Sequence, residues 1–300
     1  MSAVHLQGLG VALITPFQDD GSIDFDALSR LIAYQLASGT DYLVALGTTA
    51  ETPTLSKEER EQIIRFIVRK VNGQIPIVVG VGGNNTADLT EDLQRFDFTG
   101  ISAVLSVTPY YNKPNQEGLY RHYCALSQVS PLPLILYNVP GRTGVNMTAE
   151  TTLRIARSCS NVIAVKEASG NLQQIRAIIE GAPEGFYLIS GDDSVTTAVI
   201  GMGGIGVISV FGNAFPKAMA ELVRHALCGD ASDIRDRMDK DFENLFRLLF
   251  VEGNPAGVKG LLYLRGMIQN RLRLPLVPVS EKTLAQIKEE LPKFSDSYPL

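Results

Sequence analysis

A lysine that follows an apolar run is the residue of this sequence best suited to covalent chemistry. Lys166 comes directly after Val162–Val165, a run typical of a strand buried on both faces. Burial in apolar surroundings favours the neutral amine, and a neutral amine attacks a ketone to form an imine. The competing interpretation is a solvated lysine at a strand end, or one paired with Glu167.

Further polar groups follow other apolar runs. The segment around Thr48 and Thr49 offers successive backbone N–H groups suited to a carboxylate, although an ordinary turn would have the same composition. Arg142 has a planar fork that can bind a second carboxylate. Tyr111 and Tyr137 carry hydroxyls that relay protons without bearing charge. Surface arginine and core or interface tyrosines are the competing interpretations.

Metal and nucleotide chemistry are disfavoured by the spacing of their usual ligands. The three histidines, His5, His122 and His225, have no metal-ligand spacing, which argues against a zinc-dependent aldolase. Gly201–Gly206 matches GxGxxG, but it precedes a strand instead of joining a strand to a helix. Tight packing around the eighth strand explains these glycines better. We therefore expect neither a metal nor a cofactor.

Eight short apolar runs, most of them followed by an amphipathic stretch, must position these groups. The runs are Leu9–Ile14, Tyr42–Leu46, Ile75–Val81, Ala103–Val107, Leu134–Tyr137, Val162–Val165, Tyr187–Ile189 and Gly206–Val210. Such alternation fits a closed barrel or a doubly wound sheet. The count of eight, without an opening dinucleotide fingerprint, favours the barrel. In a barrel the candidate residues would gather at the carboxyl ends of the strands.

The helix signals are clear at both ends of the chain. Asp24 is a suitable N-cap for a helix over Phe25–Ala37, and Ser56 with Glu59 has capping-box spacing before a helix that ends at Val71. After the eighth run, four helix patterns follow with no strand between them: Lys217–Leu227, Ala231–Phe250, Pro255–Ile268 and Glu281–Glu290. The sequence predicts a (β/α)8 TIM barrel over residues 1–228 and a C-terminal helical extension over residues 229–300.

Composition limits the partners. The chain has 300 residues, 45% of them hydrophobic, and a net charge of -5, so we expect no nucleic acid partner. Three cysteines without CxxC spacing, and no signal peptide, suit a reducing cytoplasm. The uncharged stretch 194–216 is too rich in glycine for a spanning helix, and a short helix, a turn and a buried strand fit it better. We expect a cytoplasmic protein with no membrane partner.

Five motifs in register resemble one family along nearly the whole chain. They are Gly47–Glu51, Thr108–Pro114, Tyr137–Gly144, Val165–Gly170 and Gly191–Asp193. They are similar to the dihydrodipicolinate synthase family, pyruvate-dependent class I aldolases of the diaminopimelate branch of lysine biosynthesis. Ala50 stands where many members have glycine.

The resemblance implies a role for each candidate. Lys166 would form the Schiff base with pyruvate, whose carboxylate the amides of Thr48 and Thr49 would bind. Arg142 would bind the carboxylate of L-aspartate 4-semialdehyde, which condenses to give 4-hydroxy-tetrahydrodipicolinate. Thr49, Tyr111 and Tyr137 would relay protons, and the backbone carbonyl of Ile208 would line the lysine site.

Assembly and regulation follow from the same resemblance. It implies a homotetramer, a dimer of dimers, in which Tyr111 reaches across a subunit interface. It also places a lysine-binding allosteric site at residues Thr52, Pro53, Lys57, Arg60, Asn84, Asp88 and Tyr110. Lys57 and Arg60 are cations where inhibited members often have histidines, so we expect L-lysine to inhibit weakly.

Two other functions compete with this one. A sister lyase, acting on N-acetylneuraminate or a 2-keto-3-deoxy sugar acid, would share the barrel, the lysine and pyruvate. Arg142 and the Thr48–Thr49 pair favour the smaller, carboxylate-bearing aldehyde. A catalytically silent barrel would typically lack the lysine or a tyrosine, and Lys166, Tyr111 and Tyr137 are all present.

Overall fold

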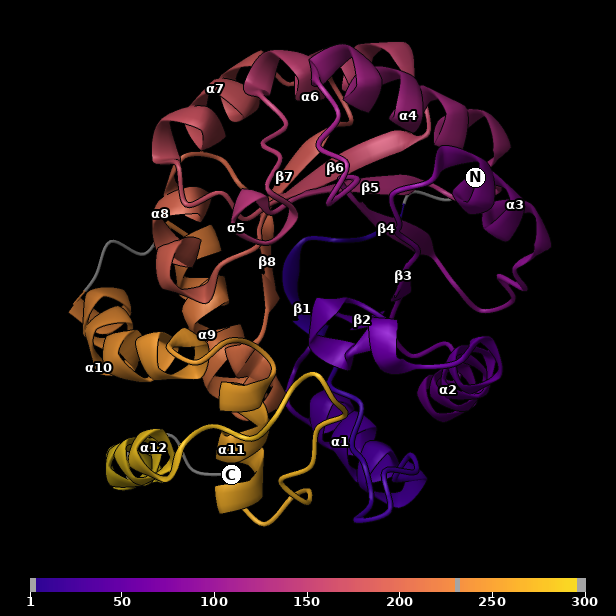
Figure 1. Ribbon diagram of the computed structural model, residues 1–300. Coiled ribbons are helices and arrows are strands. Elements are labelled where there is room, and N and C mark those ends of the chain that lie inside the picture. The colour runs from indigo at the N-terminus through magenta and orange to yellow at the C-terminus, as the bar shows by residue number, and fades with distance from the viewer. Residues whose placement is uncertain (1–3, 230–232, 296–300) are drawn as a thin grey trace.

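The chain forms a closed barrel of eight parallel strands (Figure 1). A computed structural model describes residues 4–229 and 233–295. The strands are β1 (Gly8–Ala12), β2 (Tyr42–Ala45), β3 (Ile77–Gly80), β4 (Ala103–Val107), β5 (Leu134–Asn138), β6 (Val162–Glu167), β7 (Tyr187–Ser190) and β8 (Gly206–Ser209). All eight predicted runs are therefore strands, and the predicted TIM barrel is confirmed.

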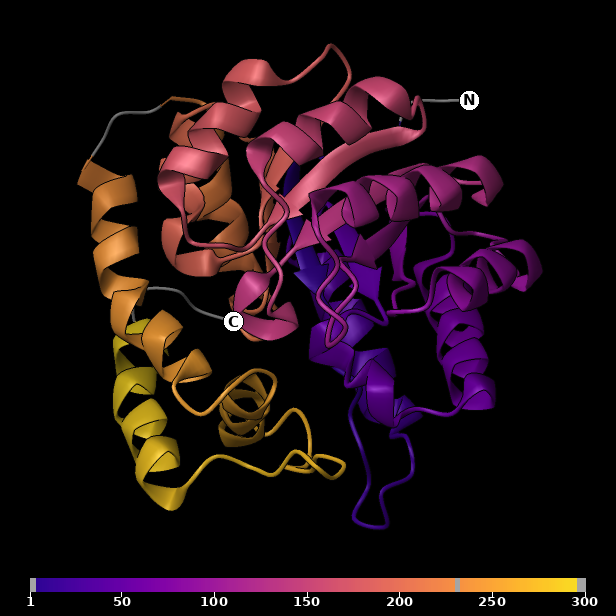
Figure 2. The same ribbon diagram turned by 45° about the horizontal axis from the view of Figure 1, so that its top comes forward.

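Helices follow the strands, and all of them except the short helix Pro140–Thr143, which lies over the mouth, surround the outside of the barrel (Figures 1 and 2). They are α1 (Phe25–Ala37), α2 (Lys57–Val71), α3 (Thr86–Arg95), α4 (Gln116–Val129), α5 (Pro140–Thr143), α6 (Ala149–Ser158), α7 (Leu172–Gly181), α8 (Thr196–Gly201) and α9 (Pro216–Leu227). The two predicted caps are confirmed. Asp24 accepts the amide of Ala27, and Ser56 and Glu59 form a reciprocal capping box before α2.

Three helices extend the barrel at its C-terminal side: α10 (Asp233–Phe250), α11 (Ala256–Leu264) and α12 (Glu281–Ser295). They gather beside α9 and α1 (Figure 1). The first two residues predicted for α10, 231 and 232, lie outside the described part of the chain. α11 ends earlier than predicted, where Gly266 adopts a positive φ of 70°. The boundary between barrel and extension at residues 228 and 229 stays a prediction.

The strands are buried on both faces, as their apolar runs require. One apolar cluster fills the barrel interior and includes Val44, Val78 and Leu105, and a second lies between the strands and the outer helices. The β1–β8 seam is tight, because a Cβ on Gly206 would lie 2.0 Å from the carbonyl oxygen of Gly8. This close approach confirms the structural interpretation of the Gly201–Gly206 segment.

The uncharged stretch 194–216 folds as the short helix α8, a turn and the strand β8, as predicted. In residues 4–229 and 233–295, no helix combines the length and apolar character that crossing a bilayer requires.

Candidate active site

Lys166 and Tyr137 are neighbours inside the mouth of the barrel. β6 extends two residues beyond its predicted end, so Lys166 lies within the strand, paired in register with Tyr137 of β5. Side chains alternate along a strand, and Ile135 and Ala164 point into the interior, as do the residues two positions on. Lys166 is 6% exposed and Tyr137 7% exposed. The lysine Nζ lies 4.4 Å from the centre of the tyrosine ring.

Glu167 faces the opposite side of β6 and has other partners. Its carboxylate accepts hydrogen bonds from the Asn138 side chain at 3.0 and 3.1 Å, the Ser169 amide at 2.8 Å and the Gln174 side chain at 3.1 Å. Burial raises the pKa of this carboxyl, and the hydrogen bonds oppose the shift. Within the described residues, the competing interpretation of Lys166 as its ion-pair partner therefore finds no support, since the Lys166 amine lies over the Tyr137 ring.

Thr48 and Thr49 form the start of a short helical turn that follows β2. The turn covers Thr48–Ala50, and the Glu51 amide closes it by donating to the Thr48 carbonyl at 3.2 Å. The first N–H groups of such a turn have no partner within it. No acceptor for the Thr48 or Thr49 amide lies in residues 4–229 and 233–295, so both are available to a ligand.

A buried ion pair lies behind this turn. The side chains of Glu51 and Lys259, from α11, are in contact and both 0% exposed. Glu51 also accepts the Arg273 amide at 3.0 Å, and Lys259 donates to the Arg271 carbonyl at 2.9 Å. Burial lowers the pKa of Lys259 to about 8, against the opposing effect of Glu51. This pair joins the C-terminal helices to the turn that carries Thr48 and Thr49.

Asn254 is a site residue that the sequence did not reveal. It is 6% exposed, and its side-chain amide donates to the Thr49 hydroxyl at 2.9 Å. Its backbone carbonyl accepts from the Arg142 guanidinium at 3.1 Å, and its side-chain oxygen is buried without a hydrogen-bond partner among the described residues. Asn254 lies in a Gly-Asn-Pro loop, and nothing in that pattern distinguishes it from an ordinary turn.

These groups line one cavity of about 520 Å³ at the carboxyl ends of the strands. Arg142, on the short helix α5, is exposed at its edge. The helix α10 contributes the outer wall with Phe246 and Phe250. The lining residues are Thr48, Thr49, Tyr137, Val139, Arg142, Lys166, Ala168, Gly191, Asp192, Ser194, Val210, Glu243, Phe246, Arg247, Phe250 and Asn254. The volume suits small ligands.

Two predicted residues lie apart from this cavity. Tyr111 is 88% exposed and has a positive φ of 72°, so its ring points away from the described chain. Ile208 lies on β8, and its side chain is 1% exposed within the interior cluster that also contains Tyr137. The structure thus brings together Lys166, Tyr137, the threonine pair and Arg142, but not Tyr111.

Comparison with known proteins identifies the family. The model of the dihydrodipicolinate synthetase family matches residues 5–293. The chain belongs to this family. A 4-hydroxy-tetrahydrodipicolinate synthase of Parabacteroides distasonis is 57% identical over 295 residues, which cover 98% of this chain and 99% of the relative.

Solved structures of the family have the same fold. A dihydrodipicolinate synthase from Acinetobacter baumannii, complexed with pyruvate, superposes with a TM-score of 0.92 at 39% identity and covers 96% of this chain and 99% of its own. A structure described as the first monomeric dihydrodipicolinate synthase variant has a TM-score of 0.92 and 42% identity, and the match covers 96% of each chain.

Proposed function

We propose that this chain condenses pyruvate with L-aspartate 4-semialdehyde to give 4-hydroxy-tetrahydrodipicolinate, a step of lysine and diaminopimelate biosynthesis. Membership of the family and the 57% identity to a 4-hydroxy-tetrahydrodipicolinate synthase support this activity. The observation that carries the proposal is the buried Lys166 amine, 4.4 Å from the ring centre of Tyr137, in the cavity that the Thr48–Thr49 turn also lines.

The chemistry of this arrangement begins at the lysine. The Lys166 amine attacks the ketone carbon of pyruvate, and loss of water gives an imine. The free amides of Thr48 and Thr49 would hold the pyruvate carboxylate, because successive N–H groups bind anions well. Loss of a methyl proton converts the imine to an enamine, which attacks the aldehyde carbon of the second substrate. The substrate amine then closes the ring by displacing Lys166. No cofactor or metal enters this sequence.

Proton transfer and the second carboxylate are assigned to the remaining groups. Tyr137, beside the amine, is suited to move the protons of imine formation. The Thr49 hydroxyl, oriented by Asn254, would continue the relay. Arg142 would bind the carboxylate of L-aspartate 4-semialdehyde at the cavity edge, while the Asn254 carbonyl fixes one of its nitrogens. We expect the backbone carbonyl of Ile208 to line the part of the site that holds Lys166.

We assign the Tyr111 hydroxyl to proton transfer in the active site of a neighbouring subunit. A tyrosine that is 88% exposed at a positive φ is costly unless something outside the chain contacts it. Such a contact agrees with the assembly that the family resemblance implies, and we propose on that ground a homotetramer built as a dimer of dimers, in a cytoplasmic setting. Sedimentation velocity measures the assembly, and a monomer with full activity would contradict this arrangement.

Trapping with borohydride tests the lysine. Incubation with pyruvate and borohydride should add one reduced pyruvate to the intact mass of the protein. The Lys166→Arg variant should gain nothing, because arginine stays protonated and is no nucleophile. Lys217→Arg, at an exposed position of α9, is the matched control and should be trapped like the parent. An adduct on Lys166→Arg would assign the chemistry to another lysine.

Mixed subunits test the relay across the interface. Lys166→Arg and Tyr111→Phe chains are each expected to be nearly inactive alone. In a mixed dimer, one site combines an intact Lys166 with the partner subunit's intact Tyr111, so activity should return. Mixtures that stay inactive, although mass spectrometry shows mixed dimers, would place Tyr111 in the site of its own chain or outside the reaction.

The sister-lyase alternative is tested by substrate. The assay compares L-aspartate 4-semialdehyde with N-acetylneuraminate after the pyruvate adduct has been established. The relatives and the Arg142 side chain at the cavity edge favour the first substrate. Cleavage of N-acetylneuraminate at the higher kcat/KM would contradict the proposal while leaving the Schiff base intact.

A further inference from the structure

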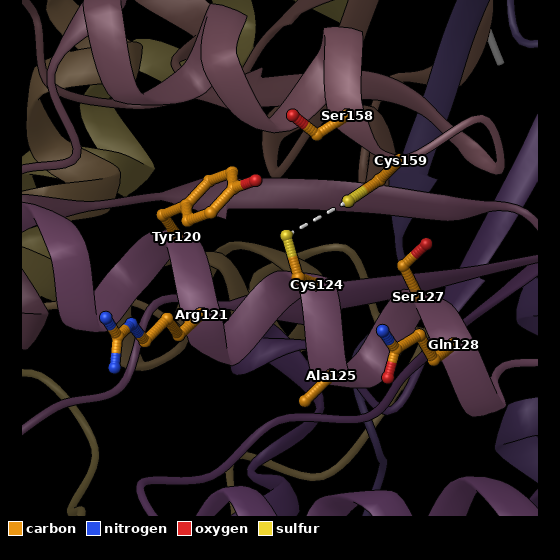
Figure 3. Close-up of a pocket in the computed structure, with 8 residues that line it drawn as sticks. All are labelled: Tyr120, Arg121, Cys124, Ala125, Ser127, Gln128, Ser158 and Cys159. Atoms are coloured by element: carbon orange, nitrogen blue, oxygen red, sulfur yellow. Dashed lines mark hydrogen bonds between the residues drawn. The ribbon is translucent and has the colours of Figure 1, made fainter.

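Two cysteines that are distant in sequence meet on the outer layer of the barrel. Cys124 lies on α4, and Cys159, 35 positions later, is the C-cap residue that directly follows α6. Their sulfur atoms are 3.4 Å apart, and Figure 3 shows the two side chains pointing toward one another. The three cysteines have no CxxC spacing in the sequence, so the meeting of these two is a product of the fold. Both are free cysteines.

A surface cavity of about 370 Å³ gives access to this pair. Cys124 is half-buried and Cys159 is 5% exposed, and both line the cavity together with Tyr120 and Ser127 (Figure 3). A small reagent can therefore approach the Cys124 sulfur from solvent. Cys228 is exposed and stands apart on the chain, which makes it an internal reference for simple thiol accessibility.

We propose that Cys124 and Cys159 are a redox-active dithiol that closes to a disulfide by exchange with a low-molecular-weight disulfide such as oxidised glutathione. The Cys124 thiolate attacks one glutathione sulfur, which forms a mixed disulfide and releases one glutathione thiol. The Cys159 thiol then gives its proton to solvent and attacks the Cys124 sulfur, which releases the second. The two protein thiols are oxidised, and one glutathione disulfide is reduced to two thiols.

The local scaffold favours closure. A disulfide requires the two sulfurs to approach by about 1.4 Å, a shift within reach of side-chain rotation. Ser127 and Asn161 exchange hydrogen bonds between α4 and the turn after α6, one of them from the Asn161 amide to the Ser127 carbonyl at 3.0 Å. The Asn161 carbonyl accepts the Leu134 amide at 2.8 Å. These contacts hold the two cysteine backbones in place.

The second step should be the slow one. Burial, the largest cause, raises the pKa of the Cys159 thiol above its usual range, and it persists after Cys124 has formed the mixed disulfide. Little of it is thiolate at neutral pH, and the thiolate is the attacking species. Closure should accelerate about tenfold per pH unit while Cys159 remains mostly protonated.

The bond would act on stability and leave the active-site cavity unchanged. Cys159 lies just before β6 begins, at the amino end of the strand, whereas Lys166 lies near its carboxyl end. A disulfide constrains the unfolded chain more when it closes a longer loop, and this loop spans 35 positions. Closure should slow thermal inactivation severalfold and change kcat by less than about twofold.

The test uses Cys228→Ser protein, in which only the pair remains. After equilibration with oxidised glutathione, we expect loss of both titratable thiols and of two hydrogens from the intact mass, with no glutathione adduct. Tryptic peptides 122–142 and 158–166 should be joined. Cys124→Ser and Cys159→Ser in the same background are the matched controls, and each lacks the joined peptides.

Three outcomes would overturn the proposal. Two thiols that remain free at high ratios of oxidised to reduced glutathione would show that the pair does not close. A stable mixed disulfide on Cys124 would show that Cys159 cannot resolve it. If oxidised and reduced protein inactivate on heating at the same rate, the disulfide does not stabilise the protein. The thiol titration, the intact mass and the joined peptides are independent of the synthase activity, so the dithiol proposal and the proposed function can fail or succeed separately.

Discussion

Replacing Lys259 by Met should destabilise the protein strongly, because it leaves a buried carboxylate without its counter-charge. Lys259 and Glu51 are both 0% exposed, and the Lys259 Nζ also lies 4.2 Å from the centre of the Phe17 ring. In the variant, Glu51 would keep only the Arg273 amide among its present donors. Removing one partner of a buried ion pair costs about 3–5 kcal/mol. Methionine fills a similar volume, so little of that cost would come from a cavity.

A second substitution separates charge from packing. Glu51→Gln in the Lys259→Met background removes the uncompensated charge and keeps an oxygen for the Arg273 amide. The double variant should recover at least about half of the lost stability, because a buried pair replaced as a whole is often close to neutral. Lys217→Met, exposed on α9, is the matched control and should change stability by less than about 0.5 kcal/mol.

Urea denaturation followed by fluorescence or circular dichroism gives these free energies of unfolding. Glu51 also closes the Thr48–Ala50 turn, so the same variants should raise the KM for pyruvate more than that for the second substrate. A loss below about 1 kcal/mol for Lys259→Met would show that the buried carboxylate finds other donors or takes up a proton. A double variant no more stable than the single one would refute charge as the cause.

Three further results are expected. Arg142→Ala should raise the KM for L-aspartate 4-semialdehyde about 10- to 150-fold, since a charge-assisted contact is worth about 1.5–3 kcal/mol. An equal rise in the KM for pyruvate would show that Arg142 does not specifically bind the second substrate. Burial lowers the pKa of His122 to about 4, so the unfolded state takes up the proton first on acidification. Stability should therefore fall by about 2 kcal/mol between about pH 7 and pH 5 on account of this group, and His122→Gln should flatten that part of a denaturation series. L-lysine should inhibit half-maximally only above about 1 mM, because Arg60 is held by the Thr52 carbonyl at 3.0 Å and remains a fixed cation; stronger inhibition in an activity titration would show that Arg60 and Lys57 do not oppose binding.

The barrel and the centre of the site were predictable because their signals are local. Parallel strands buried on both faces leave continuous apolar runs in the sequence, and groups that follow such runs meet at one end of a barrel. The gathering of Lys166, Tyr137 and the Thr48–Thr49 turn at one end of the barrel was predicted in this way. Strand ends were less certain, and β6 proved two residues longer than its apolar run, because its last residues are polar and still buried.

The remainder of the site depends on contacts that span most of the chain. Asn254 meets Thr49 across 205 positions, and Lys259 meets Glu51 across 208. No periodicity encodes such a pairing. Lys259 did carry a usable signal, since a single charge in the apolar helix Ala256–Leu264 requires a buried counter-charge. Asn254 carried none, because asparagine before proline is common in turns.

The contact between Asn254 and Thr49 has a consequence for the timing of synthesis. All eight strands and Lys166 are synthesised before residue 254, on the order of a few seconds earlier at typical rates of translation. A nascent chain that has just completed β8 contains every strand of the barrel, but it lacks the amide that orients the Thr49 hydroxyl and the lysine that neutralises Glu51. The emerging enzyme would therefore acquire its chemistry only once the last quarter of the chain has folded onto the barrel.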